Sequence, residues 1–195
     1  METSTTLILA SGSPRRQELM KAMGVQFSVK VRDVDEQFPA ELKDAEVALY
    51  LANKKASAYS EEIALGHTVI TADTIVCVDH LILNKPSGYE EAFDMLKKLS
   101  GRSHEVITAV CIKNKVISRS FHVTTKVVFR KLTDSEINYY INTCKPYDKA
   151  GAYGIQEWIG LVGLERIEGS YYNVVGLPAK ELYEELLSLN LVNQK

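Results

Sequence analysis

The sequence has few of the residues that build metal knuckles or disulfide-linked proteins. Its 195 residues include three cysteines and four histidines. Cys77, Cys111 and Cys144 are odd in number and form no CxxC pair, so neither a zinc knuckle nor a disulfide framework is indicated. The histidines show no HxH or HExxH spacing. We expect free, buried thiols in a reducing compartment, and structural or surface histidines.

The sequence also lacks an excess of one charge and any long apolar run. Lys and Arg total 23 against 25 Asp and Glu, which gives a net charge of −2. No general attraction to nucleic acid or to an anionic membrane follows from this balance. The apolar stretches are far shorter than the about 20 residues of a membrane helix. Residues 1–6 contain no basic side chain, so we expect no secretory signal and a cytoplasmic protein.

What is present is the composition of a folded domain, with 46% hydrophobic and 25% charged residues. We treat residues 1–195 as a single domain. Hydrophobic periodicity and capping signals, including Ser87 with Glu90 and Thr133 with Glu136, indicate interleaved strands and helices. The class predicted is α/β, with a mixed, twisted sheet and flanking helices. Strands are expected near residues 6–10, 27–31, 68–72, 75–78, 81–83, 105–112 and 116–129, and helices near 14–23 and from 44, 87, 133 and 178.

The first candidate site is a turn that leads into a helix. Ser11 and Ser13 follow the first predicted strand, and Pro14 suits the first helical position. A helix N-terminus presents free backbone N–H groups that favour an anion. Arg15 and Arg16 add fork-shaped donors that match phosphate oxygens. A plain helix cap with two solvated arginines explains the same residues equally well.

The second candidate is Asp73, a carboxylate between two apolar β runs. Burying an unpaired carboxylate is costly, so Asp73 is a candidate cation ligand or a base acting on water. An Asp turn at a strand end is the simpler interpretation of this residue alone. Glu36, Lys55 and Lys85 are ordinary surface charges unless the fold brings them together. Lys55 falls near an apolar helix stripe, from which its ammonium can reach solvent.

The third candidate is the segment at residues 148–156, whose glycines permit close approach of the backbone to a ligand. Gln156 carries a donor and an acceptor, which suit the edge of a nucleobase. The alternative is an ordinary junction between a loop and a helix.

Taken together, these motifs resemble the Maf family, also called septum formation inhibitor-like proteins. The matching stretches follow the family order and span nearly the whole chain. They are residues 9–19 (LASGSPRRQEL), 71–76 (TADTIV), 84–86 (NKP), 99–106 (LSGRSHEV), 148–156 (DKAGAYGIQ) and 167–178 (IEGSYYNVVGLP).

The resemblance implies a fold like that of inosine triphosphate pyrophosphatases, with two lobes around a central cleft. It also implies hydrolysis between the α- and β-phosphates with Mg²⁺ or Mn²⁺ as cofactor. The Gly-Ile-Gln form of the late motif is similar to the dTTP/UTP-cleaving branch. A homodimer is implied by the resemblance alone, and no stable nucleic-acid or membrane partner is expected.

Carried over position by position, the resemblance assigns roles to ten residues. Asp73 matches the catalytic acid and, with Glu36, is expected to hold the cation. Residues linked to base choice are Arg15, Thr74 and Gln156, and polar residues that line the family cleft are Ser11, Ser13, Arg16, Glu36, Lys55 and Lys85. Many relatives have glycine after Gly-Ile-Gln, whereas here Glu157 and Trp158 follow. We expect this bulky pair to reshape the rim of the base pocket.

Two other functions fit the same sequence. The first is a non-catalytic nucleotide- or nucleic-acid-binding regulator of cell division, which needs the same phosphate-binding residues but no turnover. The second is an enzyme that removes modified or noncanonical nucleotides from the pool.

Overall fold

The computed structural model describes residues 6–193; residues 1–5, on which the expectation about a secretory signal largely depends, lie outside that range. The chain divides into two compact units, each with its own hydrophobic core. Unit 1 comprises Met1–Asp73, Thr108–Val123 and Gly176–Lys195, and unit 2 comprises Thr74–Ile107 and Thr124–Val175. Strands β3 (Thr68–Val78), β5 (Ser103–Lys113) and β6 (Ser118–Phe129) supply residues to both units.

The strands pair in both directions. Their order is β2-β1-β3-β5-β6-β7, and β4 pairs with β3. Strand β1 (Leu7–Leu9) is parallel to β2 (Ser28–Val29) and to β3, with Leu9 opposite Ile70. Strand β4 (Leu81–Leu83) is antiparallel to β3, and β7 (Leu164–Glu168) is antiparallel to β6. These pairings confirm the predicted mixed sheet and the α/β class.

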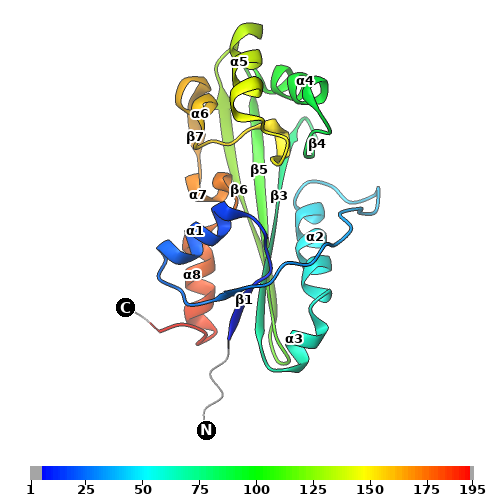
Figure 1. The fold of residues 1–195 in the computed structure, drawn as a ribbon, viewed down its shortest axis with the longest axis vertical. Helices are drawn as coiled ribbons and strands as arrows, with labels where there is room; N and C mark the ends of the chain where they lie inside the picture. Colours follow the sequence, from blue (N-terminus) through cyan, green and yellow to red (C-terminus); the bar gives the residue numbers. More distant parts are fainter. Residues whose placement is uncertain (1–5, 194–195) are drawn as a thin grey trace. The chain divides into compact units, whose positions relative to one another are not determined.

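In unit 1, helices cover both faces of the sheet (Figure 1). Side chains of a strand alternate between the two faces, so a strand covered on both sides is apolar throughout. Leu7 and Leu9 join the core with Met20, whereas Ile8 packs with Tyr59. The helices on the first face are α1 (Pro14–Ala22) and α8 (Ala179–Ser188), and those on the second are α2 (Ala45–Ser57) and α3 (Ser60–Ala64).

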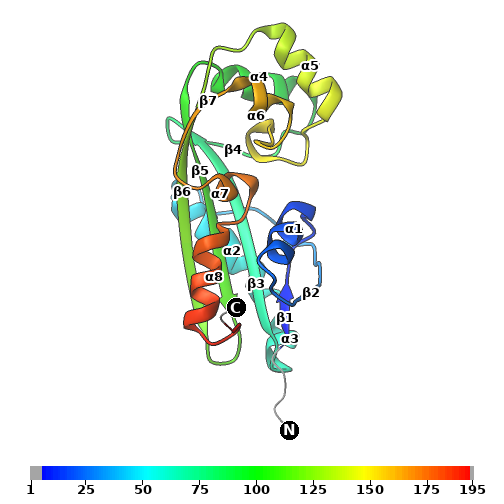
Figure 2. The ribbon, with the colours of Figure 1, turned by 90° about the vertical axis from the view of Figure 1, so that its left-hand side faces the viewer.

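Unit 2 has a separate core, in which Leu96, Phe129 and Ile141 are fully buried. Helices α4 and α5 pack against each other there, and Figure 2 shows them with α6 near the upper end of β5 and β6. The helices of this unit are α4 (Tyr89–Leu99), α5 (Asp134–Cys144), the 3₁₀ turn η1 (Ala150–Ala152), α6 (Trp158–Gly163) and α7 (Tyr171–Val175).

One of the two predicted capping boxes is confirmed and the other is wrong. Thr133 caps α5, its hydroxyl accepts from the backbone N–H of Glu136, and the Glu136 carboxylate accepts from the Thr133 N–H. Helix α4 begins at Tyr89, after Gly88, later than the sequence suggested. The carboxylate that turns back to Ser87 is therefore that of Glu91, at 2.7 Å from both the backbone N and Oγ.

Other differences concern the strands and the glycine-rich segment. The predicted runs on either side of Asp73 form the single strand β3, and residues 151–169, given no element from sequence, contain α6 and β7. Cys77 and Cys111 are buried free thiols and Cys144 is half-buried. Within residues 6–193, no helix combines the length and the apolar character needed to cross a membrane.

Candidate active site

Asp73 lies in β3 and is only 6% exposed. The alternation along the strand turns Thr71 and Asp73 toward α2. The Thr71 hydroxyl donates to the backbone oxygen of Ala52 in that helix at 2.7 Å, which fixes the strand against it. The simpler interpretation of Asp73, a turn at a strand end, is wrong, because the residue is buried inside a continuous strand.

Lys55, in the last turn of α2, neutralises this buried carboxylate. Its Nζ lies 2.5 Å from Asp73 Oδ1 and 2.8 Å from Glu36 Oε1. The side chain of Lys55 is itself mostly buried, so its charge faces the carboxylates and is screened little by solvent. One ammonium group therefore links two acids that are distant in sequence.

Glu36 belongs to a segment without regular secondary structure, between β2 and α2. A second lysine of α2 holds this segment: Lys54 Nζ donates to Asp35 Oδ2 at 3.0 Å and to the Gln37 backbone oxygen at 2.9 Å. The two contacts lie on either side of Glu36, whose side chain remains 45% exposed. Consecutive lysines of one helix turn thus place the exposed carboxylate beside the buried one.

Arg16 connects the turn before α1 to β3, at the residue next to Asp73. Its Nη1 donates to the Ala72 backbone oxygen and its Nε to the Gly176 backbone oxygen, each at 2.8 Å. Nη1 also lies 3.5 Å from the Ser11 hydroxyl. Arg16 therefore lies near Asp73 in unit 1, as the predicted pairing of the carboxylate with an arginine requires.

The turn itself has the predicted geometry. Ser13 is the residue before α1, and Pro14 occupies the first helical position. The Ser13 side chain makes no capping bond, and the Ser13 N–H donates to Ser11 Oγ at 3.3 Å. Ser11 is buried, whereas Ser13 and Arg15 are half-buried. A helix N-terminus with serine and arginine side chains beside it is suited to hold an anionic group.

Burial and the nearby positive charges shift the pKa of the Asp73 carboxyl in opposite directions. Burial raises the pKa of Asp73, and Glu36 adds to that rise, while Lys55 and Arg16 lower the pKa but do not reverse the effect of burial. For Arg16, burial lowers the pKa, against an opposing effect of Asp73. A carboxyl with a raised pKa is a better proton acceptor than an ordinary surface aspartate.

The donor set fits a cation that is shared with a phosphate ligand. No group of three or more His, Cys, Asp or Glu side chains gathers at one point within residues 6–193. Asp73 and Glu36 supply two carboxylates, linked through Lys55. Mg²⁺ in phosphate-binding enzymes is held by one or two carboxylates, waters and substrate oxygens, so two carboxylates are sufficient.

The remaining predicted residues belong to unit 2. Thr74 follows Asp73 in β3 and is half-buried. Lys85 is exposed just after β4, and the oxygen of its neighbour Asn84 accepts from the Gly151 N–H at 3.2 Å. Gln156 is exposed between buried Ile155 and the N-terminus of α6. Because the residue is exposed, its side-chain amide can reach a ligand.

Glu157 and Trp158, which we expect to reshape the rim of the base pocket, both pack against neighbouring side chains. The Glu157 side chain is 23% exposed and folds back to Lys149 and Tyr140. Trp158 packs edge-on against Tyr139, with ring centroids 4.8 Å apart. Sequence reasoning gave Tyr140 and Lys149 no role.

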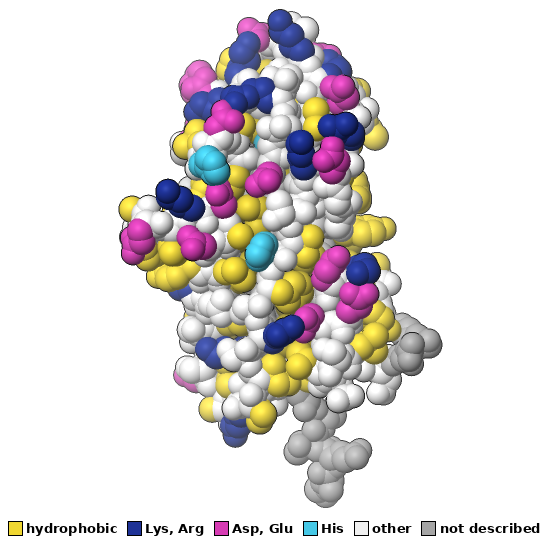
Figure 3. Space-filling model, turned by 180° about the vertical axis from the view of Figure 1, so that it is seen from behind, with side chains coloured by type: hydrophobic (Ala, Val, Ile, Leu, Met, Phe, Trp, Pro, Cys, Tyr) yellow, Lys and Arg dark blue, Asp and Glu magenta, His cyan; other side chains and the backbone are white. Residues whose placement is uncertain are grey.

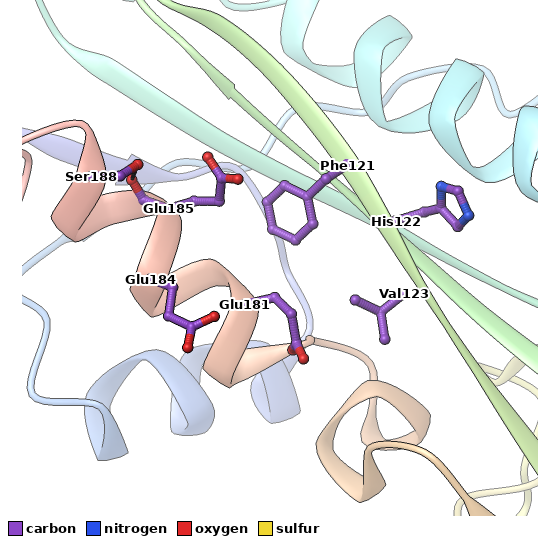
Figure 4. A pocket seen from close by; sticks show the side chains of 7 residues that line it. All are labelled: Phe121, His122, Val123, Glu181, Glu184, Glu185 and Ser188. Carbon is purple, nitrogen blue, oxygen red and sulfur yellow. Dashed lines mark hydrogen bonds between the residues drawn. The ribbon is translucent and has the colours of Figure 1, made fainter.

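A separate pocket in unit 1 includes none of the predicted site residues. It has a volume of about 340 Å³ and lies between β6 and α8. In Figure 4, three glutamates of α8 and Phe121, His122 and Val123 of β6 surround it. A concentration of carboxylates repels polyphosphate, so this pocket is not the substrate site.

The fold and the Asp73 site define a mixed α/β protein with a buried acid, a lysine and an arginine beside a helix N-terminus. The family described as Maf-like protein matches residues 6–189. The chain therefore belongs to the Maf family.

Several relatives are similar over almost their whole length. A protein named dTTP/UTP pyrophosphatase from Flavobacterium psychrophilum is 48% identical, over 95% of each chain. One of the same name from Parabacteroides distasonis is 50% identical, over 92% of this chain and 94% of the relative. The solved structure of the Staphylococcus aureus Ham1 protein is more distant, at 16% identity and a TM-score of 0.48 over 93% of this chain and all of that one. At that score the likeness carries no further conclusion.

Proposed function

We propose that this protein is a nucleoside triphosphate pyrophosphatase that hydrolyses dTTP and UTP to the monophosphate and pyrophosphate. The observation that carries the proposal is the buried Asp73 carboxylate, paired with Lys55 and close to Arg16. It occurs in a chain about half identical to proteins named for this activity. Membership of the family and the phosphate-compatible turn at Ser11 and Ser13 support the same reaction.

In the mechanism that we propose, the turn before α1 holds the phosphate chain. Backbone N–H groups at the helix N-terminus, the serine hydroxyls and Arg15 face the phosphate oxygens. Arg16 donates to the Ala72 and Gly176 oxygens. Its first task is thus to hold the turn against β3, and its charge favours the anionic form of Asp73. Lys55 offsets charge that develops on the leaving pyrophosphate. For Lys85, which belongs to unit 2, the same role stays a prediction from the family resemblance.

Asp73 acts on the water. Its carboxylate accepts a proton as the water oxygen bonds to the α-phosphorus, and the bond between that phosphorus and the bridging oxygen to the β-phosphorus breaks. The bridging oxygen leaves with pyrophosphate, and the water oxygen stays on the monophosphate. A divalent cation, Mg²⁺ or Mn²⁺, held by Asp73 and Glu36, would neutralise phosphate charge.

Gln156 is proposed to read the base. Thymine and uracil present an N3–H donor beside an O4 acceptor, and the amide of glutamine carries the complementary pair. Arg15 and Thr74 are proposed to assist base choice. We also propose that the protein works in the cytoplasm; a homodimer stays a prediction from the family resemblance.

The regulatory alternative has less support. On the face shown in Figure 3, Lys and Arg side chains are interspersed with Asp and Glu and form no broad basic patch. Proteins that bind nucleic acid without catalysis usually carry such a patch. The net charge of −2 points the same way.

The test is a substrate panel with the purified protein and Mg²⁺. Phosphate release is measured with and without added inorganic pyrophosphatase, for dTTP, UTP, 5-methyl-UTP, pseudo-UTP, dCTP and 7-methyl-GTP. We expect dTTP and UTP to react fastest, and phosphate to appear only with the coupling enzyme. Binding of dTTP without turnover would instead support the regulator, and faster turnover of the modified nucleotides would support pool cleaning.

A further inference from the structure

Tyr140, Lys149 and Glu157 form a hydrogen-bonded cluster inside unit 2. The Glu157 carboxylate accepts the Tyr140 hydroxyl through Oε2, and its Oε1 lies 3.0 Å from Lys149 Nζ. Tyr140 is fully buried and Lys149 is 8% exposed. Burial and the adjacent carboxylate both raise the pKa of Tyr140, so the phenol keeps its proton and remains a donor.

The cluster holds the backbone on both sides of Gln156. The Tyr140 hydroxyl, which donates to Glu157, accepts from the Gly154 N–H at 3.0 Å. Gly154, two positions before Gln156, and Glu157, directly after it, are thus both hydrogen-bonded to the Tyr140 phenol oxygen. The Glu157 N–H also donates to the Gly154 oxygen at 3.0 Å, which closes the turn. Gln156 is the exposed residue of this closed turn.

Packing constrains the same turn further. A Cβ atom at Gly154 would lie 2.9 Å from Glu157 Cδ and 3.1 Å from Lys149 Cε. The charged side chains therefore lie directly against the Gly154 backbone, where a larger residue would displace them. Ile155 and Ile159 are buried in the same core and anchor the flanks of the turn.

We propose that Glu157, acting with Tyr140 and Lys149, is a positioning residue that fixes Gln156 and thereby sets base selectivity. The inference rests on the proposed function. It adds that Gln156, the residue proposed to read the base, depends on its neighbours for its position. A glutamine amide can rotate to present donor and acceptor in either order. Cytosine offers the reverse order from thymine, so a loosely held amide matches both. The hydrogen-bonded turn does not set the rotation of the amide, but it fixes the backbone from which the Gln156 side chain extends, and thus the direction from which the amide can reach a base.

The experiment compares kcat and KM for dTTP and dCTP in the parent and a set of variants. Glu157→Ala removes the carboxylate, Tyr140→Phe removes only the hydroxyl, and Glu157→Gln keeps an oxygen that accepts from Tyr140. Glu165→Ala is the matched control, an exposed glutamate of the same unit. Gln156→Ala, alone and combined with Glu157→Ala, shows whether the effect passes through Gln156.

We expect Glu157→Ala and Tyr140→Phe each to lower the preference for dTTP over dCTP by roughly 10- to 100-fold, mainly through the KM for dTTP. Glu157→Gln should retain most of the preference, and Glu165→Ala all of it. In the Gln156→Ala background, Glu157→Ala should add no further loss, because the two residues act as one unit.

Parental preference in folded Glu157→Ala and Tyr140→Phe proteins overturns the inference, as does an additive loss in the combined variant. Tyr140→Phe keeps the buried ring, so it supplies the answer if Glu157→Ala does not fold. A parent that does not cleave dTTP overturns the proposed function itself and the inference with it. A parent that prefers dTTP, with variants that prefer it equally, overturns the inference alone.

Discussion

In each unit a mostly buried lysine lies between two carboxylates, and the two clusters differ in what else they contact. In unit 1, Lys55 lies 2.5 Å from Asp73 and 2.8 Å from Glu36. In unit 2, Lys149 lies 2.6 Å from Asp148 and 3.0 Å from Glu157. The Glu157 carboxylate also accepts the hydroxyl of Tyr140. Similar charge arrangements therefore occur in different surroundings.

The difference separates a reactive carboxylate from a structural one. Asp73 is buried, and its pKa is raised in spite of two nearby cations. Glu157 is tied to a neutral donor and an ammonium group that also fix the backbone next to it. A carboxylate that keeps a raised pKa is suited to proton transfer, whereas one that is fully hydrogen-bonded is suited to fix a turn.

The strongest test of this difference between Asp73 and Glu157 is to make the same carboxylate-to-amide change in both clusters. We expect Asp73→Asn to lower kcat for dTTP by about 1000-fold, because the proton acceptor and its charge are lost. Glu157→Gln should lower kcat by less than about tenfold, because its oxygen still accepts from Tyr140. Steady-state assays at pH 7 with dTTP measure both.

Thermal unfolding provides the control. Burial raises the pKa of Asp73, so the charged carboxylate destabilises the folded state at neutral pH. Asp73→Asn should therefore not lower the unfolding midpoint. If Asp73→Asn turns over dTTP at the parental rate, Asp73 is not the proton acceptor. If the variant has a much lower unfolding midpoint, Asp73 is needed for the stability of the fold.

A smaller effect is expected from Lys55. Lys55→Met removes the cation that lowers the pKa of Asp73, so that pKa should rise further. The acid limb of the pH profile of kcat/KM, where activity is lost as Asp73 takes up its proton, should move to higher pH. We expect a fall of about 100-fold in kcat/KM at pH 7. Profiles from pH 5 to about 9 test this.

Lys98→Met is the matched control, since Lys98 is an exposed lysine in the last turn of α4 as Lys55 is in the last turn of α2. Its profile should coincide with that of the parent. An acid limb that stays in place in Lys55→Met would show that the residue acting as base is not coupled to Lys55.

Local sequence signals predicted those parts of the fold that local contacts stabilise. The Thr133 capping box and the Pro14 helix start were found because all their partners lie within a few residues. Asp73 stood out because a carboxylate in an apolar β run needs a partner. The identity of that partner was not visible, since Lys55 and Glu36 reach Asp73 only through the packing of α2 on β3.

The late segment was missed for a physical reason. Glycine lowers helix propensity, so Gly160 and Gly163 argued against α6. A Cβ atom at Gly160 would lie 1.8 Å from the Ile155 backbone oxygen, so tertiary packing requires the glycine. A usable signal did exist: Lys149 and Glu157 bracket an uncharged stretch, and opposite charges at the ends of a short turn can pair.

We expect the smallest effect from replacing a third carboxylate, that of Glu136. Its contribution to stability is the reference against which the changes at Asp73 and Glu157 are compared. Arg130 and the Thr133 backbone lower the pKa of Glu136 to about 2. Glu136→Gln keeps a side chain that can complete the capping box but removes the charge facing Arg130. Because Arg130 is partly exposed, we expect a loss of only about 0.5 to 1 kcal/mol in the free energy of unfolding at pH 7.

The pH dependence separates this charge effect from a packing effect. The folded-state pKa lies below the ordinary glutamate value of 4.5, so the stabilisation by Glu136 is complete above that value and is lost as the pH falls toward about 2. Urea unfolding of parent and Glu136→Gln should therefore differ at pH 7 and converge between pH 4.5 and about 2. A difference that persists at the lowest pH would place the loss in packing. A change in dTTP turnover would show that even a half-buried carboxylate in the capping box of α5 affects the reaction, and the contrast drawn between Asp73 and Glu157 would then be too simple.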